Sequence, residues 1–470
     1  MTALRSPRSR LRALAHVTCA ALALLGAGRS AAAPGDEAAI RAVLSSASGA
    51  PGHAEPGCVF AQFEKGRTVR LVAQGQADLS AHRALDAQTL FYGASLSKQF
   101  TALATAKLVA EGKLALEDDV RRYLPELPVY ERPVTVEMLM HHTSGIRDFL
   151  SLLRLAGMED VGEASRAQAL DLLFRQQGTA FTPGSAYSYS NGGYLLLAEI
   201  VARVSGQSFA AYAREAIFRP AGMPNAYFLD NANPAAGTFA HGYLPKGDHF
   251  VERDTFPRFS GSGGLMLSMA DLAAWEREVA QGGSVWTPEV ADILLTPGRL
   301  ADGSVLDDGK GLTYGGGLHI GRRGGERIVT HGGSAQAFKH VYLRLPDRGQ
   351  SFALLCNRGD WKASATLEKA LDAAGVRRPG MPQMPAAGTY HSEELNADYT
   401  LAREGKGLAV TIATPLVESP RVLHFAPEDD GAFHAGPMRL AVTCDPARLT
   451  LSRGRSGELV LLRGDERKTR

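Results

Sequence analysis

The spacing of apolar and polar residues changes several times along the chain, and each change indicates a different kind of element. Two alternating apolar runs, at residues 58–63 and 68–73, flank the polar stretch Glu64-Lys65-Gly66-Arg67, which predicts a β-hairpin. From Leu96, apolar residues recur with a helical period, so a helix should run from there to Gly112. Further helices are predicted over residues 38–48 and 193–204, and an acidic capping box at Ser268–Asp271 predicts the start of another.

Strand-like periods return in the second half of the chain. Four apolar runs separated by turn residues predict an antiparallel meander, at residues 312–320, 326–331, 338–345 and 351–356. A helix over residues 362–374 follows. Because strands stand at both ends of this region and helices between them, residues 34–374 are predicted to form an α+β domain whose sheet joins its N- and C-terminal parts.

A second module follows this domain. Residues 375–387 are rich in proline and glycine and are predicted to be a linker. Beyond them, residues 388–470 contain short alternating runs at regular spacing, which predict a small all-β, barrel-like module.

The first 33 residues follow a pattern of their own. Four arginines between Arg5 and Arg12 precede a mostly apolar run that ends near Gly26, and small residues occupy positions 30–33. Residues 1–33 therefore read as a secretory signal peptide, and the mature protein is expected to be periplasmic or secreted. The alternative is a membrane anchor, but the apolar run is short for a span and contains His16. No later segment is apolar enough to span, so we expect no stable membrane anchor.

The charge balance argues against a nucleic-acid partner. The composition is that of an ordinary globular protein, with 45% hydrophobic and 21% charged residues. Residues 1–33 hold five arginines and no acidic residue. Without them the 51 basic residues become 46, against 49 acidic ones, and the formal net charge of +2 becomes −3. The mature chain is therefore not basic, and we expect no nucleic acid to bind it.

Three of the four cysteines remain in the mature chain: Cys58, Cys356 and Cys444. Cys58 and Cys356 lie in apolar strand-like runs, so buried thiols are expected. A Cys58–Cys356 disulfide is the alternative, and it requires those two strands to be neighbours. No CxxC, HExxH or other zinc-ligand spacing occurs, so we expect no metal.

One candidate for covalent chemistry lies at the start of the helix near Leu96. Ser95 and Lys98 are three residues apart, so their side chains share one helical face. The helix N-terminus favours developing negative charge, and a lysine whose pKa is lowered can take the proton of a serine nucleophile. This spacing alone is a weak signal, because serine and lysine meet it by chance about once in a chain of this composition.

Two further motifs strengthen the interpretation of Ser95 and Lys98 as a catalytic pair. Tyr189-Ser190-Asn191 and His331-Gly332-Gly333 follow Ser95 and Lys98 in order. With these motifs and their flanking text, residues 38–372 resemble the serine hydrolases of the penicillin-recognising fold. That family includes class C β-lactamases, D-alanyl-D-alanine carboxypeptidases, D-aminopeptidases and related esterases. The resemblance implies a β-lactamase/transpeptidase-like fold, in which an antiparallel sheet is flanked by helices and accompanied by a helical lobe.

The resemblance also implies roles for the motif residues. Ser95 would be the nucleophile that forms an acyl-enzyme, and Lys98 would keep its proton shuttle poised. Tyr189, if cations acidify its phenol, would act as the general base. Asn191 would hydrogen-bond Lys98 and the substrate amide. Because lysine and tyrosine move the protons, no cofactor is implied.

The third motif would form the opposite wall of the site. The glycines, Gly333 included, would leave room for substrate beside the strand, and the backbone N–H groups of Ser95 and Ser334 would form an oxyanion hole. His331 stands where β-lactamases of this family have a permanently charged lysine, which weakens a β-lactamase interpretation. The two histidines of His141-His142-Thr143-Ser144-Gly145 are expected to belong to a structural turn. Asp148 has no assigned partner.

The motifs favour an exported hydrolase of amide or ester bonds in small molecules or short peptides. The C-terminal β-module resembles that of D-aminopeptidase-like members, which favours D-amino-acid peptides or amides as substrates. β-Lactamase-like or short-chain esterase activity is the alternative, and a non-catalytic binder of peptides or cell-wall fragments is an alternative of another class. An α/β-hydrolase is excluded, because Ser95 lacks the second glycine of a Gly-x-Ser-x-Gly elbow. The oligomeric state stays open.

Overall fold

The computed structural model describes residues 34–45 and 54–464, apart from residues 159, 230–238, 255, 258, 310, 444–446 and 454–457. The predicted signal peptide, with Cys19, and also Cys444 lie outside the described residues. The described chain forms two compact units. One extends to Pro382, and the other holds residues 383–427 and those from 432 onward.

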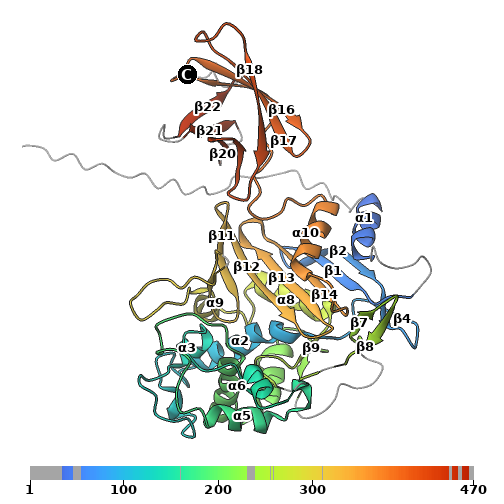
Figure 1. The fold of residues 1–470 in the computed structure, drawn as a ribbon, viewed down its shortest axis with the longest axis vertical. Helices are drawn as coiled ribbons and strands as arrows, with labels where there is room; N and C mark the ends of the chain where they lie inside the picture. Colours follow the sequence, from blue (N-terminus) through green and yellow to red (C-terminus); the bar gives the residue numbers. More distant parts are fainter. Residues whose placement is uncertain are drawn as a thin grey trace, which may run out of the picture. The chain divides into compact units, whose positions relative to one another are not determined.

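A seven-stranded antiparallel sheet organises the first unit (Figure 1). The predicted hairpin forms one edge of this sheet, and the predicted meander forms the rest, so both ends of the region share one sheet. The strand order is β10-β11-β12-β13-β14-β1-β2. The bounds are β1 (Cys58–Glu64), β2 (Arg67–Gln74), β10 (Thr313–Tyr314), β11 (His319–Arg323), β12 (Glu326–Ser334), β13 (Lys339–Leu345) and β14 (Gln350–Cys356).

Alternation along the strands gives the sheet two apolar faces. In β1, Phe60 packs in a cluster with helices α1 (Pro34–Leu44) and α10 (Ala363–Ala373), which Figure 1 shows together on one side of the sheet. Its neighbours Val59 and Ala61 point the other way, into the main core shared with the helical lobe. Helix α1 begins before the predicted range of 38–48, and residues 46–48 of that range lie outside the described residues.

The helical lobe is built around α2, a helix buried on all sides. Most of its residues are buried, and it packs against α6 and α9. Gly206 ends α6 in a left-handed conformation, and Ser268 and Asp271 form the predicted capping box of α8. The bounds are α2 (Ser97–Ala110), α3 (Val136–Met140), α4 (Phe149–Leu155), α5 (Arg166–Phe174), α6 (Asn191–Ser205), α7 (Phe209–Ala213), α8 (Met269–Gln281) and α9 (Pro288–Leu295).

Three small sheets complete this unit. A three-stranded sheet in the order β5-β9-β6 runs beside the start of α2, and two hairpins pair β3 with β4 and β7 with β8. The bounds are β3 (Gln76–Asp78), β4 (Arg83–Ala84), β5 (Phe91–Tyr92), β6 (Tyr227–Phe228), β7 (Tyr243–Lys246), β8 (His249–Glu252) and β9 (Leu265–Leu267).

The prediction of a single strand over residues 312–320 is wrong. The chain turns back on itself there, so β10 and β11 are separate strands of the sheet. Gly317 has φ +72°, a left-handed conformation that favours glycine, and the Gly315 N–H donates to the Leu318 carbonyl across the turn. The three consecutive glycines therefore form a tight turn within what reads as one apolar run.

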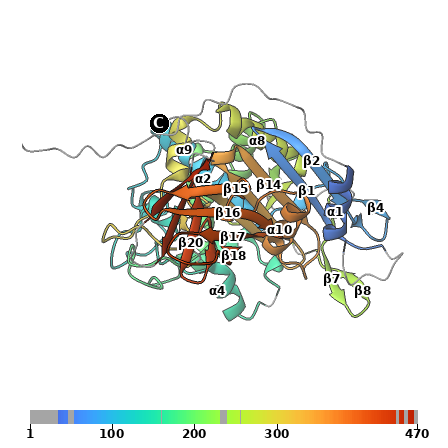
Figure 2. The same ribbon diagram turned by 90° about the horizontal axis from the view of Figure 1, so that it is seen from above.

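The second unit is a closed barrel of eight antiparallel strands, seen in orange and red in Figures 1 and 2. β15 pairs with both β16 and β22, which closes the ring. Inward-facing residues such as Tyr390, Leu401 and Val410 fill it. The bounds are β15 (Gly388–Ser392), β16 (Ala397–Glu404), β17 (Gly407–Ala413), β18 (Arg421–Pro427), β19 (Ala432–Ala435), β20 (Met438–Val442), β21 (Arg448–Arg453) and β22 (Leu459–Arg463).

The expectation of buried free thiols at Cys58 and Cys356 is wrong, because these residues form a disulfide. Strands β1 and β14 are neighbours, and their register places Cys58 directly opposite Cys356 with the Cα atoms 4.1 Å apart. The bridge joins positions 298 residues apart in sequence. Among the described residues, no helix has the length and apolarity needed to cross a bilayer.

Candidate active site

A tight 3₁₀ turn, η1 (Ala94–Leu96), places Ser95 directly before α2. Ala94 has φ +47°, a left-handed conformation that strains a residue with a side chain. Ser97 stabilises this turn, because its hydroxyl donates to the Ala94 carbonyl and accepts from the Leu265 N–H. Ser97, inside the motif, thus fixes the turn that carries Ser95, while Lys98 follows one helical turn later.

Lys98 is fully buried, with none of its surface exposed. Its Nζ lies 2.8 Å from Asn191 Oδ1, 2.9 Å from the Ser262 carbonyl and 3.2 Å from Ser95 Oγ. Two of these three neighbours can only accept a hydrogen bond, whereas the Ser95 hydroxyl can also donate one. Lys98 donates to all three atoms, and only the Ser95 hydroxyl could donate in return, so loss of one proton from the amine would leave its lone pair facing Ser95.

The electrostatics lead to the same state. Burial lowers the pKa of Lys98 to about 7, and the charge of Asp148 partly opposes this shift. A substantial fraction of Lys98 is therefore unprotonated near neutral pH, which a base for Ser95 requires.

Tyr189 lies on the other side of Ser95, with which its side chain hydrogen-bonds. Lys98 Nζ stands 4.7 Å from the centre of the Tyr189 ring, and the His142 ring packs 4.4 Å from it, centre to centre. Burial raises the pKa of Tyr189, and the hydrogen bond from Ser95 only partly opposes this. The condition for Tyr189 to be the base, an acidified phenol, is therefore not met, and its phenol is protonated near neutral pH.

His142 has a structural place, as expected of the turn at 141–145. It has φ +60°, and its Nδ1 accepts a hydrogen bond from the Ser190 N–H. Its ring also packs 4.7 Å from that of Tyr314. Burial lowers the pKa of His142 well below its ordinary value, so the ring is neutral and acts by packing against Tyr189.

Asp148 is the functional neighbour that the sequence analysis left without a partner. Its Oδ2 accepts from both the backbone N–H and the side-chain amide of Asn191, at 2.9 and 2.7 Å. Its Oδ1 caps α4 by accepting from the Ser151 N–H. The amide of Asn191 is thereby oriented with Oδ1 toward Lys98. The Asp148-x-x-Ser151 spacing signals a helix cap, but nothing local indicates that Asn191 is the second partner.

The third motif lies at the end of β12, beside the 3₁₀ turn. Beyond Thr330, β12 pairs only with β13, because its pairing with β11 ends there. A Cβ on Gly333 would stand 2.5 Å from the Gly93 carbonyl oxygen, whereas one on Gly332 would meet its nearest atom at 3.5 Å. The space on the Cβ side of Gly333 is thus filled by the Ser95 turn, and this close approach brings Ser334 and Ser95 to one pocket.

His331 is buried behind this strand end. Its Nε2 lies 3.0 Å from the Tyr314 hydroxyl and its Nδ1 2.7 Å from the Gly332 carbonyl. Its ring lies 6.3 Å from that of Tyr189. His331 therefore contacts Tyr314 and packs near Tyr189, the neighbour of Ser95. It is not among the residues that line the pocket.

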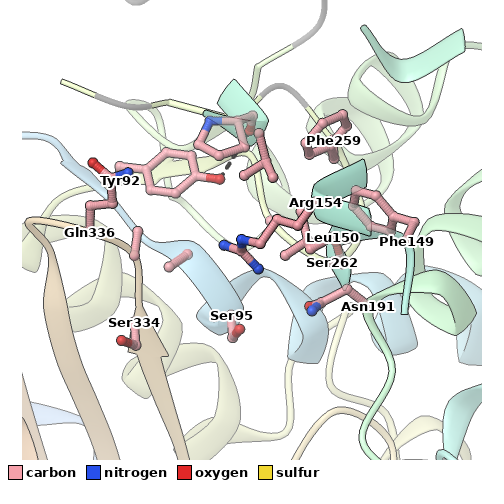
Figure 3. Close-up of a pocket in the computed structure, with 15 residues that line it drawn as sticks. Tyr92, Ser95, Phe149, Leu150, Arg154, Asn191, Phe259, Ser262, Ser334 and Gln336 are labelled. Carbon is pink, nitrogen blue, oxygen red and sulfur yellow. Dashed lines mark hydrogen bonds between the residues drawn. The ribbon is translucent and has the colours of Figure 1, made fainter. Parts of the chain in front are cut away.

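The pocket that opens over Ser95 is shown in Figure 3. It encloses about 670 Å³, including the solvent at its mouth. One wall comes from the strand side, and the opposite wall comes from α4, α6 and the segment around residue 259. The lining side chains are largely apolar or neutral: Tyr92, Ala94, Ser95, Phe149, Leu150, Arg154, Val161, Asn191, Pro257, Phe259, Ser262, Gly263, Ser334, Ala335 and Gln336.

One cluster in the described part of the chain has a metal-ligand composition. His241, Glu252 and Asp254 place one ligand atom each within 4.8 Å of one another. His241 Nδ1 lies 2.5 Å from Asp254 Oδ2, so the histidine already has a hydrogen-bond partner there. None of the three lines the pocket at Ser95.

Comparisons with known proteins agree with this geometry. The beta-lactamase family model matches residues 37–377. A D-aminopeptidase from Brucella anthropi is 31% identical over 290 residues, which are 60% of this chain and 52% of that protein. A D-aminopeptidase from Brucella ovis is 29% identical over 68% of this chain and 60% of its own length. The chain thus spans little more than half the length of these relatives.

Solved structures show the same fold. The octameric penicillin-binding protein homologue from Pyrococcus abyssi has a TM-score of 0.60 at 23% identity, covering 87% of this chain and 96% of its own. The D-amino acid amidase from Ochrobactrum anthropi SV3, complexed with D-phenylalanine, has a TM-score of 0.60 at 22% identity, covering 72% and 99%. With the family match over residues 37–377, these findings show that the chain belongs to the beta-lactamase family, which includes penicillin-binding proteins and related serine hydrolases.

Proposed function

We propose that the protein is a serine hydrolase that cleaves amide or ester bonds through an acyl-enzyme on Ser95, and that D-amino-acid amides or short peptides are its substrates. The observation that carries this proposal is the environment of Lys98. Lys98 donates to Asn191 Oδ1, to the Ser262 carbonyl and to Ser95 Oγ; when the amine is neutral, the first two acceptors keep its two N–H groups and its lone pair faces the Ser95 hydroxyl.

In the acylation step, Lys98 removes the proton of Ser95 as Oγ attacks the substrate carbonyl. The backbone N–H groups of Ser95 and Ser334 stabilise the negative charge that develops on the carbonyl oxygen. Tyr189, protonated and hydrogen-bonded to Ser95, gives its proton to the leaving amine or alcohol and recovers one from Lys98. The C–N or C–O bond breaks, and the acyl group stays on Ser95.

Deacylation uses the same groups in reverse. A water molecule enters the place of the leaving group, and Lys98 with Tyr189 removes its proton as it attacks the acyl carbonyl. The Ser95 oxygen leaves and is reprotonated by Lys98. Lys98 and Tyr189 supply these proton transfers, so the proposed mechanism uses no cofactor.

The preference for D-amino-acid substrates rests on the relatives. Two matching proteins are named D-aminopeptidases, and a structure of the same fold is a D-amino acid amidase. A β-lactamase-like or short-chain esterase activity remains the alternative prediction. The non-catalytic alternative is less well supported, because the Ser95–Lys98–Asn191 contacts of a working acylation site are all present.

The proposal is tested by a substrate screen of the purified protein. We would measure hydrolysis of p-nitrophenyl esters, D- and L-aminoacyl p-nitroanilides, D-Ala-D-Ala peptides and nitrocefin, with Ser95→Ala as the control. Hydrolysis of D-aminoacyl anilides faster than their L-counterparts supports the proposal. Equal turnover by Ser95→Ala would overturn the mechanism, and faster cleavage of nitrocefin or simple esters would replace the substrate class.

We also propose that the protein is exported. The basic and apolar pattern of residues 1–33 supports this, and so does the Cys58–Cys356 disulfide, because disulfides persist mainly in oxidising compartments. Expression of the whole chain in a bacterium, followed by fractionation and N-terminal sequencing, tests it. A periplasmic or secreted protein beginning near residue 33 is expected, and an uncleaved cytoplasmic chain would contradict it.

A further inference from the structure

Arg154 contributes a positive charge to the wall of the Ser95 pocket. It lies near the end of α4, whose first residues, Phe149 and Leu150, line the same pocket. Figure 3 shows its side chain extending from α4 into the pocket, toward Ser95 and Asn191. The guanidinium is thus placed where it can contact a bound substrate.

This guanidinium differs from its neighbours in the helical lobe. Arg166 pairs with Glu199, Arg175 with Asp171, and Arg203 with Glu126. Among the described residues, by contrast, no carboxylate or other acceptor is hydrogen-bonded to the Arg154 guanidinium. Its five N–H donors are therefore available to a ligand.

The other lining residues leave this charge uncompensated. The described lining contains no aspartate or glutamate. Asp148 is close in sequence, but its two oxygens accept hydrogen bonds from Asn191 and Ser151 and it does not line the pocket. Lys339, a second cation near the strand wall, is engaged with Ser334 Oγ and the Ala335 carbonyl. The described lining therefore offers a positive charge with no matching negative one.

The position of Tyr189 shows which part of the substrate meets Arg154. Tyr189 hydrogen-bonds with Ser95 but does not line the pocket. Since the leaving group takes its proton from the Lys98–Tyr189 pair, it lies on their side of Ser95. The acyl part of the substrate then occupies the pocket over Ser95, where Arg154 projects.

We propose that Arg154 selects substrates whose acyl part carries a carboxylate, such as acidic D-aminoacyl groups. This deepens the proposed function and rests on it. A guanidinium can bind a carboxylate through two parallel hydrogen bonds. Arg154 thus places in this pocket a charge that His331, which is buried and does not line it, cannot supply.

The test compares two substrates that differ only in charge, N-acetyl-D-glutamyl and N-acetyl-D-glutaminyl p-nitroanilide. Acetylation removes the α-ammonium group, which would otherwise interact with Arg154 itself. Their dissociation constants are measured by calorimetry on Ser95→Ala, which cannot cleave them, and the ratio of their kcat/KM values is measured on the intact enzyme. We expect the acid to bind about tenfold more tightly than the amide, with a comparable kcat/KM ratio.

Variants identify the residue responsible. Arg154→Gln should bring both ratios to about one, Arg154→Lys should retain part of the preference, and Arg175→Gln, an exposed arginine of the same lobe, should leave the ratios unchanged. Equal affinity of Ser95→Ala for the two anilides, no measurable binding of the acid, or a preference that survives Arg154→Gln would overturn the proposal. If the intact enzyme cleaves neither these two anilides nor the unacetylated D-aminoacyl p-nitroanilides, while Ser95→Ala still binds the acid more tightly, the proposed function fails and the role of Arg154 stands.

Discussion

Asp148 accepts two hydrogen bonds from Asn191, one from its backbone N–H and one from its side-chain amide. These bonds decide which end of the Asn191 amide faces Lys98. Because Asn191 Oδ1 is one of the acceptors that hold Lys98, the carboxylate of Asp148 acts on Lys98 through Asn191 as well as through its charge.

The near-isosteric substitution Asp148→Asn tests this relationship. The charge of Asp148 raises the pKa of Lys98, so its removal should lower that pKa and move the acid limb of the kcat/KM profile to lower pH. We also expect kcat/KM to fall roughly tenfold or more, since each hydrogen bond to a charged acceptor contributes about 1.5–3 kcal/mol. A limb that stays in place or moves to higher pH would show that Asp148 does not act on Lys98.

The pH dependence of the intact enzyme should report Lys98. A base must be unprotonated to act, and burial lowers the pKa of Lys98 to about 7, so kcat/KM should rise with pH through about 7 and then level off. The expected measurement is a profile of kcat/KM from pH 5 to 9 on one neutral substrate. Full activity that persists well below pH 6 would exclude neutral Lys98 as the base.

Alanine substitutions at Gly333 and Gly332 test whether the contact between β12 and the Ser95 turn sets the geometry of the site. An added Cβ at Gly333 meets the Gly93 carbonyl oxygen at 2.5 Å, so Gly333→Ala should push β12 away from the Ser95 turn and separate the backbone N–H groups of Ser95 and Ser334, the proposed oxyanion donors. Loss of one such donor costs about 10²–10³-fold in kcat. Gly332→Ala, with its nearest contact at 3.5 Å, should lose far less.

Both glycine variants should first be checked for folding by thermal unfolding. The kcat of each is then compared with that of the unaltered protein. Equal losses in the two variants would mean that the contact between Gly333 and Gly93 does not set the geometry of the site.

The disulfide should contribute to the stability of the sheet. Cys58 and Cys356 join the first and last strands of the first unit, 298 residues apart, and removal of such a bridge costs about 2–5 kcal/mol. The double variant Cys58→Ala/Cys356→Ala should therefore unfold at lower denaturant concentration. Reducing agent should lower the midpoint of the natural protein but not that of the variant, and equal midpoints for the oxidised protein and the variant would contradict the contribution.

Local pattern was enough to predict the framework. Alternation in residues 58–73 and 326–356 identified the strands that form the sheet, and the spacing of Ser95 and Lys98 identified a helical pair that the structure places 3.2 Å apart. The turn within residues 312–320 was missed, because three glycines between apolar residues can continue a strand or reverse it. The Cys58–Cys356 bridge depends on strand register, which no local pattern reveals.

The groups around the base were harder to predict for a similar reason. Asp148 and Asn191 are 43 residues apart, and the only local signal at Asp148 is a helix cap. Arg154 reads in the sequence as an ordinary basic residue at the end of a helix, and only the packing of α4 beside Ser95 brings it into the pocket. The pKa shifts of Lys98 and Tyr189 could not be predicted either, because they depend on burial in the folded protein. In an unfolded chain both residues would keep their ordinary pKa values.

The central claim is that Ser95 becomes covalently acylated, and mass spectrometry of the trapped enzyme tests it most directly. The protein would be treated with a fluorophosphonate, and separately with a D-aminoacyl ester quenched in acid, and then digested and mapped. The account predicts one adduct, on the peptide that contains Ser95, which is absent from Ser95→Ala and forms much more slowly in Lys98→Ala. An unmodified Ser95 in the intact protein, or the same adduct in Ser95→Ala, would contradict it.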